Sequence, residues 1–333
     1  MKKQLLAATL TLLAAAKMFA LPPLLGTSDF KASTVKHLDF SMSWENLEIK
    51  KTSSSRNTIS VEVYCNKKKF APKVKLSGST LVIDSVPAST LILSLEKKSC
   101  TVVVYIPSDI TFEKAHISLS SGSIKEVEAL SAQTLSLSAS SGSVNANQIN
   151  ANKAVFHTSS GNIKTKALQA KTADFSASSG SIKISDVTVN DISITTSSGT
   201  ISAAGLLADQ FTASASSGTI GLELRDAPSK NSSITTSSGT IFVSLPKNAA
   251  ATINATTSSG GFTNAFTNEK ISSHVDYQQM INGGGARISL HASSGHITVD
   301  VGDGISASAN NKNCLVSEDD EDIPVVNLEK PIF

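Results

Sequence analysis

The chain has 333 residues, with 29 Lys and Arg against 27 Asp and Glu; 40% of its residues are hydrophobic and only 5% are aromatic. A net charge of +2 gives no electrostatic reason to expect nucleic-acid binding. After the first 20 residues no apolar run is long enough to span a membrane, so we expect no transmembrane segment in the mature chain.

The first residues have the features of a secretory signal peptide. Met1-Lys2-Lys3 gives a positive start, an apolar stretch runs from Leu5 to Ala16, and Leu21-Pro22-Pro23 ends any helix. The stretch is too short for a membrane span, which leaves an uncleaved amphipathic anchor as the alternative. We therefore expect residues 1–20 to direct export and residues 21–33 to be a linker. The mature protein would be periplasmic, displayed on the cell surface or secreted.

Export would place the three cysteines in an oxidising setting. Cys65 and Cys100 both border strand-like runs and could pair, which would leave Cys314 over in a polar tail. Connectivity cannot be read from spacing, and this spacing fits no zinc or redox motif.

The tripeptide Ser-Ser-Gly occurs nine times, and this repetition is the strongest signal in the chain. Successive glycines are 20, 19, 19, 19, 19, 21, 21 and 35 residues apart, so the last interval contains an insertion. The glycines are Gly122, Gly142, Gly161, Gly180, Gly199, Gly218, Gly239, Gly260 and Gly295.

Apolar residues alternate with polar ones between the glycines, as Ile182 and Ile184 do after Gly180. Period-two alternation indicates strands with one buried face, and its phase shifts at each tripeptide and again about five residues later. We therefore predict an all-β fold, a single-stranded parallel β-helix or solenoid. Each rung of about 19 residues would contain three short strands and pair with the next rung at a spacing of about 4.8 Å.

Two physical roles are expected for the tripeptides. Glycine tolerates positive φ, which a sharp corner can require, and serine hydroxyls can bond backbone groups that a bend leaves unpaired. A flexible Gly/Ser linker is the alternative. It is excluded because apolar alternation resumes after nearly every glycine.

The regions around the repeat are less regular. Residues 34–116 contain strand-like runs without the tripeptide, including Thr90–Leu95, and are predicted to be irregular rungs and a cap. Residues 117–302 form the predicted Ser-Ser-Gly solenoid, from which Asn264–Gly285 is expected to bulge. Residues 303–333 read as a polar acidic tail; calcium binding at Glu318–Asp322 is an alternative that lacks a spaced ligand loop.

These residues resemble the bacterial "putative adhesin" domains of unknown function, also called toast-rack domains. The resemblance lies in a strand ending in Ile106-Pro107, in the Ser-Gly-x-Ile rungs, and in Gly283–Ile288 leading into Ser293–Ile297. It covers about residues 35–302 and implies an envelope-associated or exported solenoid with suspected adhesion or envelope-stress roles. The family offers no catalytic residues to carry over.

Candidate chemistry is sparse, and we predict no cofactor, no metal site and no enzyme activity. Asp174 and Asp191 lie on neighbouring rungs, with Lys153 nearby, but they are predicted to be diagonal neighbours at best. His291 and His296 flank the last tripeptide, and the corner between them is expected to put their side chains on different faces. A polysaccharide lyase or hydrolase would need clustered carboxylates on one outward face.

One outward feature suggests a ligand. Lys125, Lys164 and Lys183 each stand three residues after a corner glycine, and Lys166 lies close by. Stacked rungs would align them into a modest positive ladder that could meet an anionic glycan or lipid headgroup. A solubilising face is the alternative.

The sequence thus favours a non-enzymatic exported β-solenoid that acts as an adhesion or scaffolding surface. Its partner would be a protein or glycan of the envelope or of a host surface. An envelope-stress signalling or assembly partner of the same fold is the first alternative, and a glycan-cleaving enzyme is the second.

Overall fold

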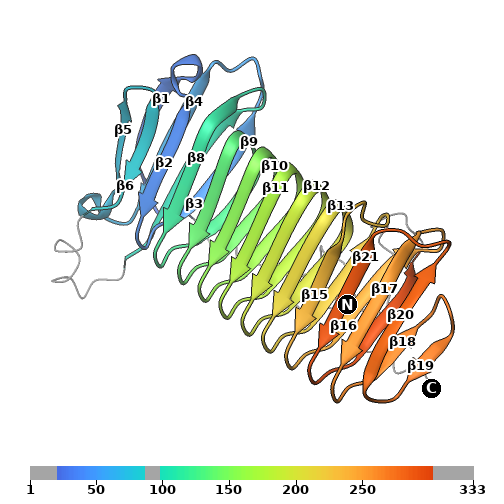
Figure 1. Cartoon of the computed structure of the whole chain (residues 1–333). Coiled ribbons are helices and arrows are strands. Elements are labelled where there is room, and N and C mark those ends of the chain that lie inside the picture. Colours follow the sequence, from blue (N-terminus) through green and yellow to red (C-terminus); the bar gives the residue numbers. More distant parts are fainter. Residues whose placement is uncertain (1–20, 87–97, 303–333) are drawn as a thin grey trace, which may run out of the picture.

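A computed structural model describes residues 21–86 and 98–302 as a rod of stacked coils in one sheet (Figure 1). Within these residues the only helices are two short 3₁₀ turns, Ala32–Thr34 and Lys68–Phe70. The predictions for residues 1–20, for the Thr90–Leu95 run and for the tail with Cys314 lie outside the described residues.

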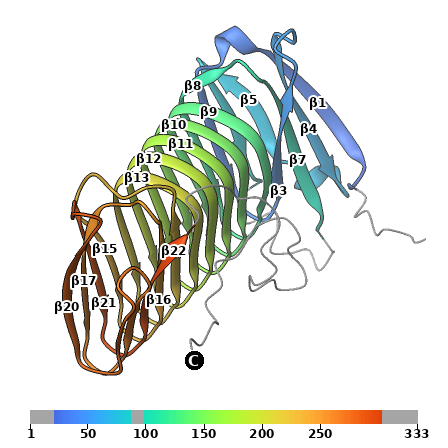
Figure 2. The same cartoon turned by 90° about the vertical axis from the view of Figure 1, so that its right-hand side faces the viewer.

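The middle of the rod consists of parallel strands that follow one another in chain order (Figures 1 and 2). They are β8 (Thr111–Leu119), β9 (Ile124–Ala139), β10 (Val144–Thr158), β11 (Ile163–Ala177), β12 (Ile182–Thr196) and β13 (Ile201–Ala215). From β9 to β13 each rung is one continuous strand that bends between tripeptides, not three separate strands. The reason is that the parallel ladder to the next rung runs through the bends with few gaps.

The core is a set of aliphatic columns along the axis. Ile163, Ile182 and Ile201 stand in register and are fully buried, which confirms the predicted stacking. In two neighbouring columns, a large side chain in one is accompanied by a small side chain in the other, or both are of medium size. From rung to rung the pairs are Ala154 with Phe156, Ala173 with Phe175, Ile192 with Ile194, and Phe211 with Ala213. The interior is narrow and packed to normal density, so the combined volume of the two side chains must stay similar in each rung.

The glycines of the tripeptides also form a column, but for a different reason from the one expected. None of the nine has a positive φ, so the expectation of a left-handed corner was wrong. Instead, a Cβ on Gly180 would overlap the carbonyl oxygen of Gly161 one rung away, and the other eight would likewise overlap a backbone oxygen. Glycine is required because two backbones approach too closely for any side chain.

The C-terminal end is built from short strands whose spatial order departs from chain order. They are β14 (Ile220–Leu224), β15 (Ser232–Thr236), β16 (Ile241–Pro246), β17 (Ala251–Thr257), β18 (Phe262–Asn264), β19 (Glu269–Ile271), β20 (Val275–Ile281), β21 (Arg287–Ala292) and β22 (Ile297–Gly302). Strand β21 lies between β15 and β17 (Figure 1). Strand β22 lies between β16 and β18. The last rung of the chain is therefore inserted between two earlier rungs. The segment expected to bulge from the repeat instead forms strands at the far end of the rod.

A threonine–alanine alternation follows the spatial order and not the chain order. Three residues before each glycine from Gly142 onward, the stack reads Ala139, Thr158, Ala177, Thr196, Ala215, Thr236, Ala292 and Thr257. Each threonine bridges two rungs. The Thr196 hydroxyl accepts from the Gly199 N–H at 3.1 Å and donates to the Gly180 carbonyl at 3.1 Å. Serine hydroxyls also form bonds at the corners: Ser259 donates to the Ser293 carbonyl at 3.4 Å, and Ser123 accepts from the Ser143 N–H at 3.2 Å.

The N-terminal end shows the same kind of insertion. Its strands are β1 (Leu24–Lys31), β2 (His37–Met42), β3 (Asn46–Thr52), β4 (Thr58–Cys65), β5 (Lys73–Ser77), β6 (Thr80–Asp84) and β7 (Cys100–Pro107). Strand β2 lies between β6 and β8, and β3 lies between β7 and β9. Antiparallel strands then cover both ends of the rod, through β5, β4 and β1 at one end and β19 and β20 at the other. Such covers limit the unpaired backbone that open parallel rungs would expose.

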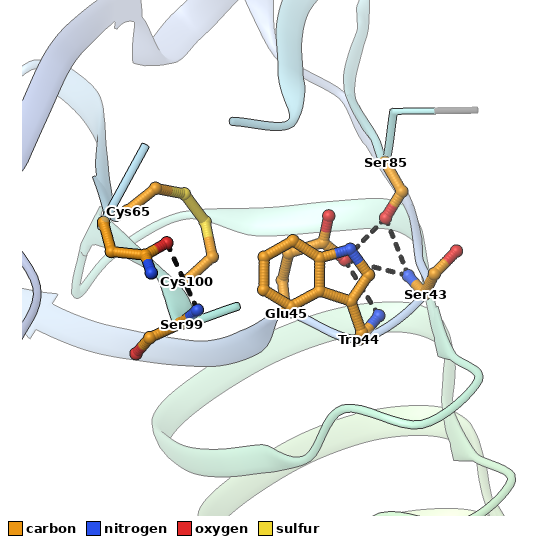
Figure 3. The surroundings of a disulfide bond; sticks show 8 residues. Ser43, Trp44, Glu45, Cys65, Ser85, Ser99 and Cys100 are labelled. Atoms are coloured by element: carbon orange, nitrogen blue, oxygen red, sulfur yellow. Dashed lines mark hydrogen bonds between the residues drawn. A yellow bond between two sulfur atoms is a disulfide. The ribbon is translucent and has the colours of Figure 1, made fainter. Parts of the chain in front are cut away.

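The tripeptide column ends on the turn Ser43-Trp44-Glu45, which stands where a further Ser-Ser-Gly would be. Figure 3 shows the side chains of this turn. The Glu45 side chain is fully buried, and its Oε2 accepts from the N–H groups of Ser43 and Trp44 at 3.0 Å and from the Ser85 hydroxyl at 2.5 Å. A carboxylate thus accepts hydrogen bonds from backbone N–H groups at the point where the repeat stops.

A disulfide between Cys65 and Cys100 joins β4 to β7 beside this turn (Figure 3). The pairing that the sequence left open is therefore present. Trp44 packs against this bridge and meets Phe70 edge-on, with ring centroids 5.9 Å apart. The bridge closes a loop of 35 residues in the least regular part of the rod.

The glycine column predicts a sharp contrast between two glycine-to-alanine variants. Gly180→Ala should lower the free energy of unfolding by about 3 kcal/mol, because its Cβ would push against the backbone of the neighbouring rung. Gly26→Ala is the matched control, since no atom lies within 4 Å of its added Cβ. Urea unfolding followed by circular dichroism measures both, and equal stability of the two variants would refute this explanation of the column.

The threonine bridge makes a second prediction. Thr196→Val keeps the shape but removes the hydroxyl, and should cost roughly 1–3 kcal/mol because the Gly199 N–H loses its partner in a buried site. Thr195→Val, on the exposed neighbouring position, should change stability little. Comparable losses in both variants would show that the bridge is not what stabilises the corner.

Candidate functional site

The structure brings only two of the four predicted lysines side by side. Lys164 and Lys183 are register partners, with Asn145 before them and Ser202 after them in the same column. The predicted ladder is therefore a short positive patch, interrupted by neutral side chains.

The remaining two lysines lie off this column. Lys125 falls where the register between β9 and β10 shifts. Lys166 lies at a bend, where its carbonyl accepts from the Ser185 hydroxyl at 2.9 Å. Lys164, Lys166 and Lys183 each already take part in an interaction within the protein.

The carboxylates weighed for catalysis are not paired with each other. Asp174 is the register partner of Ser193, and Asp191 is the partner of Thr172, so the two are diagonal neighbours on adjacent rungs. Asp191 forms an ion pair with Lys230 at 3.4 Å, and both side chains are about half exposed. Lys153 lies in the Asp191 column, two rungs away. This arrangement places Asp174 and Asp191 apart from each other, and it pairs Asp191 with Lys230 and not with Lys153.

The two histidines at the last tripeptide bind different threonines. His291 Nδ1 lies 2.9 Å from the Thr256 hydroxyl, and His296 Nε2 lies 3.0 Å from the Thr263 hydroxyl. Burial, and secondarily the charge of Lys270, lower the pKa of His296 below its usual 6.5. Across residues 21–86 and 98–302 no three His, Cys, Asp or Glu side chains are grouped as metal ligands would be.

A groove of about 620 Å³ runs along the rod across five successive rungs. Its lining comes in triplets, one from each rung: Asn150–Asn152, Gln169–Lys171, Thr188–Asn190, Leu207–Asp209, and Asp226, Ala227 and Ser229. The middle residue of each triplet is small and largely buried, and the flanking residues point outward. The result is a shallow floor of small side chains between two columns of mostly polar ones.

Hydrogen bonds fix one wall of this groove. The Asn190 side chain donates to Asp209 at 2.8 Å, and the Ser229 hydroxyl donates to the same carboxylate at 3.2 Å. These bonds lower the pKa of Asp209, so it remains ionised. Arg225 reaches back to the carbonyl of Val187 at 2.9 Å and to the Thr188 hydroxyl at 2.6 Å. The groove is thus bordered by side chains that are held in place between rungs.

A second hollow, of about 500 Å³, lies between the turn after β1 and the loop after β7. Lys36 and Glu113 border it and form an ion pair at 3.4 Å, in which both side chains are more than half exposed. Surface pairs of this kind contribute little to binding or stability. We therefore take the longer groove as the candidate site.

Our reasoning from the sequence missed this groove, although a signal was present. The triplets Asn150-Ala151-Asn152, Gln169-Ala170-Lys171, Thr188-Val189-Asn190 and Leu207-Ala208-Asp209 recur at the repeat interval. Alternation by itself identifies only the buried middle members. The outward members form columns only once the rungs are stacked.

A family model described as Toastrack DUF4097 matches residues 35–300. The chain belongs to this family. The match spans the rod from β2 to β22, including both inserted rungs. No curated protein matches the chain at a significant level.

Solved structures with a similar fold include three described as putative adhesins. The protein from Parabacteroides distasonis is 11% identical, with 84% of this chain and 97% of that chain covered and a TM-score of 0.47. The protein from Parabacteroides merdae is 10% identical, with 83% of this chain and 96% of that chain covered and a TM-score of 0.43. The protein from Bacteroides fragilis is 12% identical, with 82% of this chain and 96% of that chain covered and a TM-score of 0.35. At such low identity and TM-score we draw no functional argument from them. Within the residues described, no helix has the length and apolar character needed to cross a membrane.

The lowered pKa of His296 predicts a pH dependence of stability. In the unfolded chain His296 binds a proton near pH 6.5, whereas in the folded chain it does so only at a lower pH. The contribution of neutral His296 to stability is therefore complete above pH 6.5 and is lost as the pH falls toward the lower pKa of the folded state. His296→Gln should show a weaker fall in Tm between neutral and mildly acidic pH than the unsubstituted protein. His157→Gln, on an exposed position of β10, should keep the original fall. Parallel pH profiles for all three proteins would contradict this assignment.

Proposed function

We propose that this protein is an exported, non-catalytic rod that acts as an adhesion or scaffolding surface in the bacterial envelope. The observation that carries the proposal is the groove, because it repeats one set of outward positions over five rungs. A surface of this kind offers many weak contacts at equivalent positions to an extended partner, which suits attachment better than chemistry at a single point.

An enzyme of the lyase or hydrolase type is the weaker candidate. It would need an acid and a base poised on either side of a scissile bond. Asp191 is instead paired with Lys230, and Asp174 is displaced from it along the rung. The described part of the groove holds Asp209 and Asp226, and Asp209 is kept ionised by its neighbours and so is unsuited to act as an acid.

The lysine pair supports a second, smaller contact. Lys164 and Lys183 are adjacent on one face, and we propose that they meet anionic groups of the membrane surface. Lys125 and Lys166 would add only outlying charge, because the register does not align them with the pair.

A solid-phase binding assay tests the proposal. The purified protein is applied to immobilised bacterial envelope material and to immobilised host extracellular matrix, and the material is then analysed for new reducing ends and unsaturated sugars. We expect saturable retention with no change in the material. Product formation that Asp174→Ala or Asp191→Ala abolishes would establish an enzyme instead, and absence of retention on both materials would overturn the adhesion and scaffolding role. Cell fractionation tests export separately.

A further inference from the structure

The groove has a composition that suits hydroxyl-rich ligands. Its columns carry the amides of Asn150, Asn152, Gln169 and Asn190, together with the hydroxyls of Thr188 and Ser229. Amide and hydroxyl groups both donate and accept hydrogen bonds, as sugar hydroxyls do. Leu207, which is 38% exposed, adds an apolar contact in the middle of the polar row.

The spacing of the groove distinguishes between classes of polymer. Successive rungs are about 4.8 Å apart, whereas an extended peptide advances only about 3.3 Å per residue. A peptide lying along the axis would therefore fall out of register with the equivalent side chains after one or two residues. A linear chain of pyranose sugars advances by nearly one rung for each sugar, so each unit can lie beside the corresponding positions of one rung.

The charged side chains of the groove discriminate between uncharged and anionic polymers. Asp209 and Asp226 lie at one end of the groove. Among the described lining residues Lys171 is the only cation; beside the groove, Arg225 is bonded to Val187 and Thr188, and Lys230 is paired with Asp191. Phosphate or uronate groups would be repelled at that end, which disfavours nucleic acids and acidic polysaccharides. The lysine pair on β11 and β12 lies in a different column of the rungs and does not line the groove.

We propose that the groove binds an uncharged linear polysaccharide lying along the rod, with one sugar unit at each of five rungs. This inference rests on the proposed function and specifies its partner. Because no aromatic side chain is among the described residues that line the groove, none of these holds a sugar by stacking. Affinity then comes from the number of rungs that are occupied at the same time.

The test is a calorimetric titration of the purified protein with uncharged oligosaccharides of increasing length. The probes are linear β-1,4-glucose, β-1,4-N-acetylglucosamine, β-1,3-glucose and α-1,4-glucose series, each from dimer to octamer. For at least one series we expect affinity to rise with each added sugar up to about the pentamer and then level off, since the groove spans five rungs. No binding in any series, or affinity independent of length, would overturn the proposal.

Paired variants locate the site. Gln169→Ala combined with Asn190→Ala removes one amide from each wall and should raise the Kd for the pentamer at least about tenfold. Asn145→Ala combined with Asn162→Ala removes two amides from other positions of neighbouring rungs and should leave the Kd unchanged. Equal losses in both pairs would refute the groove as the site. Circular dichroism confirms that each variant is folded.

A last comparison separates this inference from the broader function. If retention on envelope or matrix material persists in the Gln169→Ala and Asn190→Ala variant, the adhesion role stands and the groove assignment fails. If that retention is instead abolished by Lys164→Glu with Lys183→Glu, the lysine face is the contact. If both retention and oligosaccharide binding are absent in the unsubstituted protein, both proposals fail.

Discussion

The close approach of neighbouring backbones is the constraint on which the rest of this structure depends. Rungs held about 4.8 Å apart by parallel ladders bring the glycine of each tripeptide against a backbone carbonyl of the neighbouring rung. No residue with a Cβ fits there. The same spacing stacks every side chain on its equivalent, so a large group in one column needs a small one beside it, as Phe175 has Ala173 and Phe211 has Ala213.

The ends of the rod show how a repeat of this kind is closed. A parallel stack has no natural end, and its open rungs would pair with other chains. Here a rung from each terminal region is inserted one place inward, and antiparallel strands are laid outside it. The buried Glu45 carboxylate ends the tripeptide column, and the Cys65–Cys100 disulfide ties together the strands beside it. Irregular sequence is therefore concentrated where the geometry of the stack changes.

The same stacking arranges the outward side chains into columns along the rod. Any outward position becomes a column with the period of the rungs, so a modest set of side chains is multiplied along the axis. The two columns that flank the small residues at Ala151, Ala170 and Ala208 become a groove in this way. The lysines remain a pair because Asn145 and Ser202 occupy the adjoining rungs of their column. Repetition thus favours an extended partner over a single reactive centre.

Much of this protein is determined by its sequence, because period-two alternation and a fixed interval between glycines admit few other folds. The parallel stacking of Ile163, Ile182 and Ile201 and the family follow from these patterns. Three features depended on the tertiary structure: the insertion of β21 and β22, the role of the glycines, and the groove. The alternation of Thr236, Ala292 and Thr257 encodes that insertion, but it can be read only once the spatial order is known. Chain order does not say which rungs touch, and both the clash at a glycine and the column along a groove exist only between rungs.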